Sequence, residues 1–460
     1  MTSYCSTRGP IRRLFIANRG EIAVRIIRAA SELGIETVLG VSSADRESLA
    51  ARLADAVVEL GPPAAARSYL NIDAVLAATE ASGADAVHPG YGFLSENAEF
   101  AHAVRRMGRT FVGPDPETIE LMGNKAVARE CAMRAGVPTV PGTQGVVSDV
   151  ELALGSSSVI GFPVMLKAAA GGGGKGIRVA RSPDELATMF VEAQREALAA
   201  FGDGGIYLEK FFGRARHIEV QVLGDGQDVI HLYDRECSLQ RRRQKILEEA
   251  PAPSLTAEVR DRLCAAAVAL ARSVSYSSAG TIEFLYDDDA GEFFFIEMNT
   301  RIQVEHPTTE MVTGVDLVRE MLCIAGGARL RLRQDDIRLH GAAIECRLNA
   351  EDPDRGFLPS PGTVNGLRLP GGPGVRVDSM LYDGYKVPPF YDSLLAKIVV
   401  WDENRSRAIS RMKRALGEIE LGGIKSTLPL HLRLLGTEAV QSANYHTDFL
   451  EEWLAASAGC

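Results

Sequence analysis

The sequence predicts a mixed α/β and α+β protein of about three domains, because its 460 residues are about three times the ~150 of a typical domain. The N-terminal part alternates buried-strand and helical patterns, a glycine-rich loop further on lies between two strand patterns, and β-rich segments follow from Ile206. These observations predict a parallel α/β domain first, a small α+β module next and a larger β-rich portion last.

The N-terminal elements form repeated β-α-β units. An apolar run at 14–17 predicts a buried strand, and apolar residues at helical spacing predict a helix over 21–33. The alternation continues with strands at 37–41, 56–60, 84–88 and 110–113 and helices at 71–82 and 96–107. We therefore predict a Rossmann-like parallel domain over residues 1–113. Its first strand-helix turn lacks the G-x-G-x-x-G pattern, which disfavours a nicotinamide cofactor.

The remaining elements follow a boundary rich in proline and glycine. One helix is predicted over 119–135, and the small module contains strands at 163–167 and 177–179 and a helix at 185–199. We predict a helical linker over 114–138, a small α+β module over 139–211, a further segment over 212–330 and a C-terminal β-rich domain over 331–460.

Composition and charge exclude several classes of protein. The net charge of −10 and the pI near 5.5 give no basic footprint for nucleic acid or anionic membrane. The longest uninterrupted apolar run, 263–271, is about half the ~20 residues of a membrane-spanning helix. Seven cysteines without a C-x-x-C pair indicate reduced thiols. We expect a cytoplasmic protein that binds neither nucleic acid nor a membrane.

Lysine is scarce, since only nine of the 50 basic residues are lysine. Arginine serves a solvated surface equally well, so the surviving lysines are candidates for specific roles. Five of them lie between residues 125 and 245: Lys125, Lys167, Lys175, Lys210 and Lys245. A chance cluster of solvated side chains is the alternative. The C-terminal four receive no role: Lys386, Lys397, Lys413 and Lys425.

The glycine-rich loop at 171–176 lies between two predicted strands. Glycine lets backbone N–H groups approach phosphate closely, so the loop is typical of a lid over a triphosphate. It is not a Walker A loop, because Gly176 follows Lys175 where serine or threonine is required. A surface hairpin without a ligand is the alternative.

The segment 293–305 alternates apolar and polar residues. In an extended chain, the odd positions from Glu297 to Glu305 would all lie on one side. Glu283, on the preceding predicted strand, can face Glu297, and two carboxylates with the amide oxygen of Asn299 suit Mg²⁺. Without metal, one of the facing carboxylates should titrate high. A solvated charged face is the alternative.

Other polar segments leave two interpretations each. The basic run 240–245 either clamps phosphates or is a charged surface. The segment 88–97 follows a strand, where ligands often bind, or is a turn packed between domains; its Ser95 or Asn97 caps a helix. His217 contacts ribose or satisfies a core hydrogen bond. Cys237 is assigned to packing near the site.

Together these segments resemble the biotin carboxylase component of biotin-dependent carboxylases, which has an ATP-grasp fold. The resemblance spans nearly the whole chain and is carried by residues 16–23, 88–97, 236–242, 248–251, 295–306 and 345–353. It implies an ATP-grasp lid at 139–211, an ATP-grasp catalytic subdomain at 212–330 and a biotin carboxylase C-terminal domain at 331–460.

The resemblance also implies the site residues. ATP would be held by Lys125, Lys167, Gly172, Gly173, Gly174, Glu209, Lys210, His217 and Gln240. Mg²⁺, or Mn²⁺, would be bound by Glu283, Glu297 and Asn299. Bicarbonate would be surrounded by Lys245, Arg301, Gln303, Val304 and Glu305, and biotin would face Arg347 and Tyr91. Catalysis would rest on Glu305 as general base, with Lys245, Arg301 and Arg347 offsetting negative charge.

The implied reaction forms carboxyphosphate from ATP and bicarbonate and then carboxylates biotin, as the first half-reaction of an acetyl-CoA carboxylase type of enzyme. The chain has no Ala-Met-Lys-Met biotinyl site, so we expect biotin on a separate carrier protein and a separate carboxyltransferase. The resemblance also implies a homodimer. Arg243 stands where many members have histidine. The alternatives are another bicarbonate-activating ATP-grasp ligase, such as a carbamoyl-phosphate-forming domain, and a non-catalytic nucleotide-binding subunit.

Overall fold

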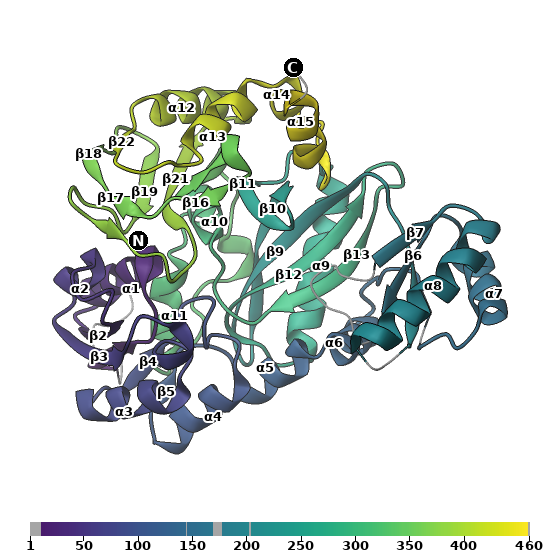
Figure 1. The fold of residues 1–460 in the computed structure, drawn as a ribbon. Coiled ribbons are helices and arrows are strands. Elements are labelled where there is room, and N and C mark those ends of the chain that lie inside the picture. Colours follow the sequence, from purple (N-terminus) through teal and green to yellow (C-terminus); the bar gives the residue numbers. More distant parts are fainter. Residues whose placement is uncertain (1–10, 144, 169–176, 202–203, 459–460) are drawn as a thin grey trace. The chain divides into compact units, whose positions relative to one another are not determined.

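The computed structural model describes residues 11–458 except 144, 169–176 and 202–203. It contains two compact units (Figure 1). The small unit comprises Pro138–Ala215 and Leu285–Ile296, and the main unit comprises the rest of the chain. The residues predicted for the lid, 139–211, lie inside the small unit. The division into five segments stays a prediction.

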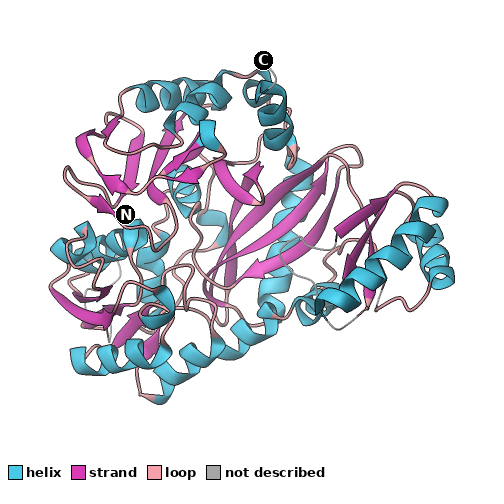
Figure 2. Ribbon diagram, viewed as in Figure 1, coloured by secondary structure: helices cyan, strands magenta, loops and turns pink. Residues whose placement is uncertain are grey.

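The main unit begins with the expected parallel sheet. Its strand order is β3-β2-β1-β4-β5, with every pairing parallel. The strands are β1 (Arg13–Ile16), β2 (Glu36–Ser42), β3 (Ala56–Gly61), β4 (Ala86–His88) and β5 (Thr110–Phe111). The helices between them are α1 (Gly20–Glu32), α2 (Leu49–Leu53), α3 (Ile72–Ser82) and α4 (Ala98–Arg106). Leu14, Phe15 and Ile16 of the central strand β1 are buried apolar residues, as expected for a strand with both faces covered. Figure 2 shows the helices in cyan and the strands in magenta.

Two asparagines fix the ends of these elements next to the 88–97 segment. The side chain of Asn97, not that of Ser95, caps α4 by accepting a hydrogen bond from Phe100 N. Asn18, directly after β1, donates to the backbone carbonyls of Pro89 (2.6 Å) and Tyr91 (2.8 Å). These bonds hold the 88–97 segment against the carboxyl end of the sheet and place Tyr91 there.

The single helix predicted over 119–135 is wrong, because two helices occupy this region. They are α5 (Pro116–Gly123) and α6 (Lys125–Arg134). Asn124 between them has an extended backbone, and its side chain accepts from the N–H groups of Ala126 and Val127. Asparagine competes for backbone hydrogen bonds in this way, and it therefore ends one helix and caps the next. As a result α6 begins at Lys125.

The small unit has a three-stranded antiparallel sheet covered by two helices. The strand order is β7-β6-β8. Its elements are α7 (Val150–Ile160), β6 (Val164–Ala168), β7 (Ile177–Ala180), α8 (Pro183–Phe201) and β8 (Ile206–Lys210). This confirms the α+β prediction for the module. The glycine-rich loop, with Gly172, Gly173, Gly174 and Lys175, lies outside the described residues.

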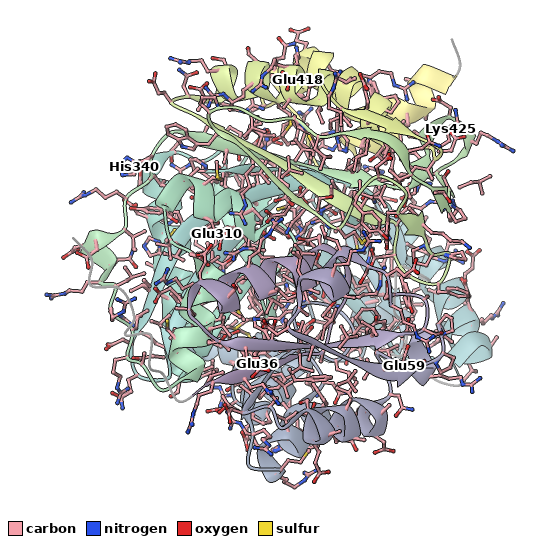
Figure 3. The ribbon with its side chains drawn as sticks, turned by 90° about the vertical axis from the view of Figure 1, so that its left-hand side faces the viewer. Glu36, Glu59, Glu310, His340, Glu418 and Lys425 are labelled. Atoms are coloured by element: carbon pink, nitrogen blue, oxygen red, sulfur yellow. The ribbon has the colours of Figure 1, made fainter. Side chains whose placement is uncertain are left out.

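A second, eight-stranded sheet has the order β13-β12-β9-β10-β11-β14-β21-β19. Its strands are β9 (Ala215–Asp225), β10 (Val229–Arg241), β11 (Gln244–Ala250), β12 (Ser277–Asp287), β13 (Glu292–Asn299), β14 (Ala342–Asn349), β19 (Val375–Ser379) and β21 (Leu394–Asp402). The helices associated with it are α9 (Ala257–Ser273), α10 (His306–Thr313) and α11 (Leu317–Ala325). In Figure 3, Glu310 of α10 lies next to the purple α1, and its carboxylate joins Arg25 of α1 (3.0 Å) to Arg376 of β19 (2.6 Å).

The C-terminal part adds short strand pairs and helices, as the β-rich prediction requires. The pairs are β15 (Glu351–Asp352) with β16 (Leu358–Pro359), β17 (Gly362–Thr363) with β20 (Lys386–Val387), and β18 (Asn365–Arg368) with β22 (Glu420–Gly422). The helices are α12 (Arg405–Gly417), α13 (Leu428–Gly436), α14 (Glu438–Gln441) and α15 (Phe449–Ala458). Among the described helices, none combines the length and the apolarity that crossing a bilayer requires.

Candidate active site

One ammonium group lies among three carboxylates in the main unit. Lys245 of β11 places Nζ 2.5 Å from Glu219 Oε2, 3.0 Å from Glu283 Oε1 and 2.5 Å from Glu305 Oε1. The carboxylates come from β9, from β12 and from the residue before α10, and all three are buried. Burial makes such charges costly unless they are paired, so this cluster indicates a functional site more than a source of stability.

The hairpin between β10 and β11 explains how Lys245 reaches this cluster. Arg241 pairs with Gln244, and the two loop residues Arg242 and Arg243 both have positive φ (47° and 66°). Two positive φ values match the tight turn that suits the twist of a hairpin. Lys245 therefore points into the cluster while Arg242 and Arg243 are exposed at the tip. The basic run is not a continuous clamp.

Gln240 is the cross-strand partner of Lys245. It is buried, and its Nε2 donates to the carbonyl of Cys237 at 2.8 Å. Cys237 itself is buried near Glu219 and Glu305, and burial raises the pKa of its thiol well above the usual value. A thiol that stays protonated fits the packing role predicted for Cys237.

Glu305 is held between two cations. Its Oε1 accepts from Lys245, and its Oε2 lies 3.0 Å from Arg347 Nη2. Burial alone would raise the pKa of Glu305, but the neighbouring Lys245 and Arg347 lower it below the usual carboxyl value. Glu305 is therefore ionised at neutral pH, which is the protonation state that a general base needs.

Arg347 of β14 joins Glu305 to a second carboxylate. Its guanidinium lies 2.5 Å from Glu248 Oε1. Burial, reinforced by the charge of Glu305, raises the pKa of Glu248 to about 7 despite the opposing effect of Arg347. Arg347 is thus a partly buried cation whose partner Glu248 changes charge near neutral pH.

The residues predicted to bind metal are only partly assembled. The Nδ2 of Asn299 donates to Glu283 Oε1 at 3.0 Å, and the Nε2 of Gln303 donates to the same oxygen at 2.8 Å. Glu297 is about one-third exposed, and its Oε2 lies 3.5 Å from Lys125 Nζ. Two carboxylates and an amide are donors that Mg²⁺ accepts, provided the Asn299 oxygen turns toward the ion. The donor set therefore fits the metal.

The prediction that a carboxylate of this set titrates high is not met at Glu283. Burial alone would raise the pKa of Glu283, but Lys245 and His217 lower it well below the usual range. His217 Nε2 lies 3.1 Å from Glu283 Oε2 and 3.7 Å from Glu219 Oε2. Although burial lowers the pKa of His217, Glu283 raises it to about 9. Cations thus occupy the space beside Glu283.

The extended row predicted from Glu297 to Glu305 is also wrong beyond Asn299. Strand β13 ends there, and Glu305 has φ −78° and ψ 3° directly before α10. Arg301 turns to Glu96 (Nε to Oε2, 2.8 Å) and donates to Asn299 Oδ1 at 2.8 Å. The polar residues still converge, but a turn brings them together where the sequence predicted one strand face.

The predicted ATP residues of the small unit are paired within that unit. The ammonium of Lys167 bonds the carboxylate of Glu209. Lys210 donates to the carbonyls of Gly161 (3.1 Å) and Phe162 (2.9 Å). Lys125, in the main unit, is mostly exposed.

Two residues of the cluster, Arg235 and Glu219, were not identified from the sequence. Arg235 of β10 is fully buried and donates to Glu219 (2.6 Å), Gln221, Thr309, Thr281 and Gln303 (2.8 Å). Nothing in its sequence neighbourhood distinguishes it from other strand residues. Glu219 carried a signal, because it lies two residues after His217 and so shares its strand face.

Family models match along most of the chain. Residues 10–119 match the biotin carboxylase N-terminal domain, residues 124–333 match the ATP-binding domain of the carbamoyl-phosphate synthase L chain, and residues 345–452 match the biotin carboxylase C-terminal domain. The chain belongs to the biotin carboxylase family. This confirms the resemblance inferred from the sequence, and with it the ATP-grasp fold and membership of a family of ATP-dependent ligases.

Relatives of this biotin carboxylase chain are similar over nearly its full length. It is 54% identical over 441 residues to the biotin carboxylase of Nostoc sp., covering 96% of this chain and 98% of that protein. It is 52% identical over 444 residues to biotin carboxylase 1 of Bacillus subtilis, with 96% and 99% covered. A pyruvate carboxylase subunit of Methanothermobacter thermautotrophicus is 50% identical over 442 residues, with 96% and 90% covered.

Solved biotin carboxylase structures share the fold. The biotin carboxylase domain of a thermophilic 2-oxoglutarate carboxylase, bound to bicarbonate, has a TM-score of 0.92 and 46% identity, with 96% of this chain and 98% of that chain covered. A biotin carboxylase from Campylobacter jejuni, in a β-γ-ATP complex, has a TM-score of 0.88 and 45% identity, with 96% and 99% covered.

Proposed function

We propose that this biotin carboxylase uses ATP to activate bicarbonate and then carboxylates biotin carried by a separate protein. The observation that carries the proposal is the arrangement of Glu305 between Lys245 and Arg347 (2.5 Å and 3.0 Å). A buried base flanked by two cations suits a reaction in which an anion loses a proton and negative charge develops beside it.

In the first step, Glu305 takes the proton of the bicarbonate hydroxyl, and the resulting oxygen attacks the γ-phosphorus of ATP. The bond from γ-phosphorus to the bridging oxygen breaks, ADP leaves, and carboxyphosphate forms. Lys245 and Arg301 offset the charge that develops. Backbone and side-chain groups of Gln303 and Val304 complete the bicarbonate site.

In the second step, carboxyphosphate releases CO₂ and phosphate, and the phosphate takes the ureido N–H proton of biotin. Arg347 stabilises the enolate-like ureido oxygen, and the nitrogen then captures CO₂. Tyr91 faces the same substrate. Its hydroxyl donates to Glu21, so its oxygen is left to accept a hydrogen bond, which matches a ureido N–H donor.

ATP would be held by Lys125, Lys167, Glu209, Lys210, His217, Gln240 and the glycine-rich loop at Gly172, Gly173 and Gly174. Mg²⁺ or Mn²⁺ would be bound by Glu283, Glu297 and Asn299, and when bound would neutralise phosphate charge. Metal binding requires that Lys125 release Glu297 and that Lys245 release Glu283. The release is favourable because the metal then pairs with these carboxylates, and phosphate pairs with the lysines.

The acceptor and assembly complete the proposal. We assign the chain to the first half-reaction of an acetyl-CoA carboxylase, as a cytoplasmic homodimer with a biotin carboxyl carrier protein and a carboxyltransferase. Full-length similarity to proteins named simply biotin carboxylase supports this, as does a solved relative described as a dimer. The described cysteines are free thiols (Cys131, Cys237, Cys264, Cys323 and Cys346), which fits a reducing compartment.

The acceptor is tested by reconstitution with a carrier and one carboxyltransferase at a time. The proposal predicts transfer of labelled carboxyl from ¹⁴C-bicarbonate to acetyl-CoA. Transfer to pyruvate or 2-oxoglutarate alone, with the cognate transferases, would reassign the chain without changing its first half-reaction.

A further inference from the structure

Lys397 is one of the four C-terminal lysines for which the sequence indicates no role, yet it is fully buried on β21. Its Nζ lies 2.9 Å from the Val304 carbonyl oxygen and 3.0 Å from Glu21 Oε1. Asp378 Oδ2 is 3.9 Å away. A buried ammonium is retained only where it is paired, and one of its partners here is the backbone directly before Glu305.

Strand register places Lys397 beside the proposed biotin-binding arginine. Lys397 pairs with Arg347 of β14 on one side and with Asp378 of β19 on the other. Directly opposed residues in a sheet share a face and lie close together. The side chains of Lys397 and Arg347 therefore lie next to each other on the face of the sheet that is directed toward Val304 and Glu305.

The two peptide groups around Val304 are both anchored at their carbonyl ends. The Gln303 carbonyl contacts His306 Nδ1 at 2.7 Å, and the Val304 carbonyl accepts from Lys397. In a planar trans peptide the C=O and N–H point in opposite directions. The N–H groups of Val304 and Glu305 are therefore directed away from His306 and Lys397. Successive backbone N–H groups fixed in this way can bind an anion.

Lys397 also connects this turn to Tyr91. The oxygen of Glu21 that contacts Lys397 is the one that accepts from the Tyr91 hydroxyl. The buried ammonium of Lys397 thus contacts both the Val304 carbonyl and the Glu21 carboxylate that accepts from Tyr91. The proposed bicarbonate and biotin residues are tied together through it.

We propose that Lys397 is a positioning residue for bicarbonate: by holding the Val304 carbonyl, it presents the backbone N–H groups of Val304 and Glu305 to the anion. Lys397 touches no reacting atom in this role. The inference rests on the proposed function, because it concerns how that bicarbonate site is built.

The test uses Lys397→Met in the full chain, and the double variant Lys397→Met with Glu21→Gln. Lys397→Met alone leaves the carboxylate of Glu21 without its cation, and the double variant removes that charge. The amide oxygen introduced by Glu21→Gln can still accept from Tyr91. Lys425→Met is the matched control, because the Lys425 side chain is exposed at the surface (Figure 3). The readouts are KM for bicarbonate, KM for ATP, and the rise in Tm that bicarbonate causes in the presence of MgADP.

Both Lys397 variants are expected to raise KM for bicarbonate about tenfold or more. Without Lys397 the backbone N–H groups are no longer held toward the anion, and losing one hydrogen bond to a charged group usually has about this effect. KM for ATP should change less than about twofold, and the bicarbonate-dependent rise in Tm should be lost. The double variant should recover thermal stability without recovering the bicarbonate KM. Lys425→Met should match the wild type in every readout.

A double variant that recovers stability and bicarbonate KM together would overturn the inference, as would parallel increases in both KM values. If the wild type fails to couple ATP cleavage to bicarbonate, the proposed function fails instead. The Tm measurement still decides the inference in that case, because bicarbonate would stabilise the Lys425→Met protein and not the Lys397 variants.

Discussion

Replacement of Glu305 by glutamine removes the proposed base while keeping nearly the same shape. Lys245 retains two of its three carboxylates, at 2.5 Å and 3.0 Å, and Arg347 retains Glu248. Removing one partner of a buried pair usually costs about 3–5 kcal/mol. Since both cations keep other partners, we expect a loss of about 1–3 kcal/mol, as for one charge-assisted hydrogen bond.

The catalytic effect should be larger than the loss of stability. A positioned general base contributes about 10²–10⁴-fold to the rate, so kcat for bicarbonate-dependent ATP cleavage should fall by about that factor. ADP release is measured with saturating MgATP, and the dissociation constant for ATP is measured separately by titration. We expect that constant to change less than about threefold, because Glu305 is not among the proposed ATP residues.

Glu249→Gln is the matched control. Glu249 is also buried, pairs with Arg405 at 2.6 Å and 2.8 Å, and accepts from Tyr445. It neighbours Glu248 on β11 and so points to the opposite face. The control should lose comparable stability and keep turnover within about twofold of the wild type. Turnover by Glu305→Gln within about tenfold of the wild type would refute the base role.

Two further predictions concern the surroundings of the base. The folded-state pKa of Glu248, about 7, lies above its ordinary value of 4.5, so its contribution to stability is present at pH 4.5 and is lost as pH rises through 7. When pH rises from 5 to 8.5, the free energy of unfolding of Glu248→Gln should therefore fall less than that of the wild type. The same pH slope for both proteins in denaturant unfolding would contradict this. Asn299→Ala removes one proposed metal ligand and should raise the Mg²⁺ concentration for half-maximal ATP cleavage about tenfold, whereas an unchanged Mg²⁺ requirement would remove Asn299 from the metal site.

The sequence predicted the N-terminal sheet because apolar strands and helical spacing are local signals. It predicted one helix over 119–135 because apolar periodicity does not reveal that Asn124 prefers to bond the backbone of the next turn. It likewise overextended β13, since alternation from Glu297 to Glu305 is compatible with a strand but the chain turns after Asn299. Local patterns fix the type of an element better than its ends.

The site itself depends on contacts between distant segments. Lys245, Glu305 and Arg347 are brought together from three separate elements, and nothing in local periodicity predicts that convergence. The family resemblance named these residues, and the structure places them in contact. Arg235 and Lys397 were not identified because a buried charge on a strand has no distinctive neighbours in the sequence. Lysine scarcity was a useful indication, although its significance for Lys397 became clear only from the fold.

The central claim is that this chain couples ATP cleavage to bicarbonate and biotin. The most direct measurement is ADP release by the purified protein at saturating MgATP, with and without bicarbonate and with and without free biotin. We predict slow cleavage that requires bicarbonate and is stimulated by biotin. ATP cleavage independent of bicarbonate, or bicarbonate-dependent cleavage stimulated by ammonium and not by biotin, would contradict the claim.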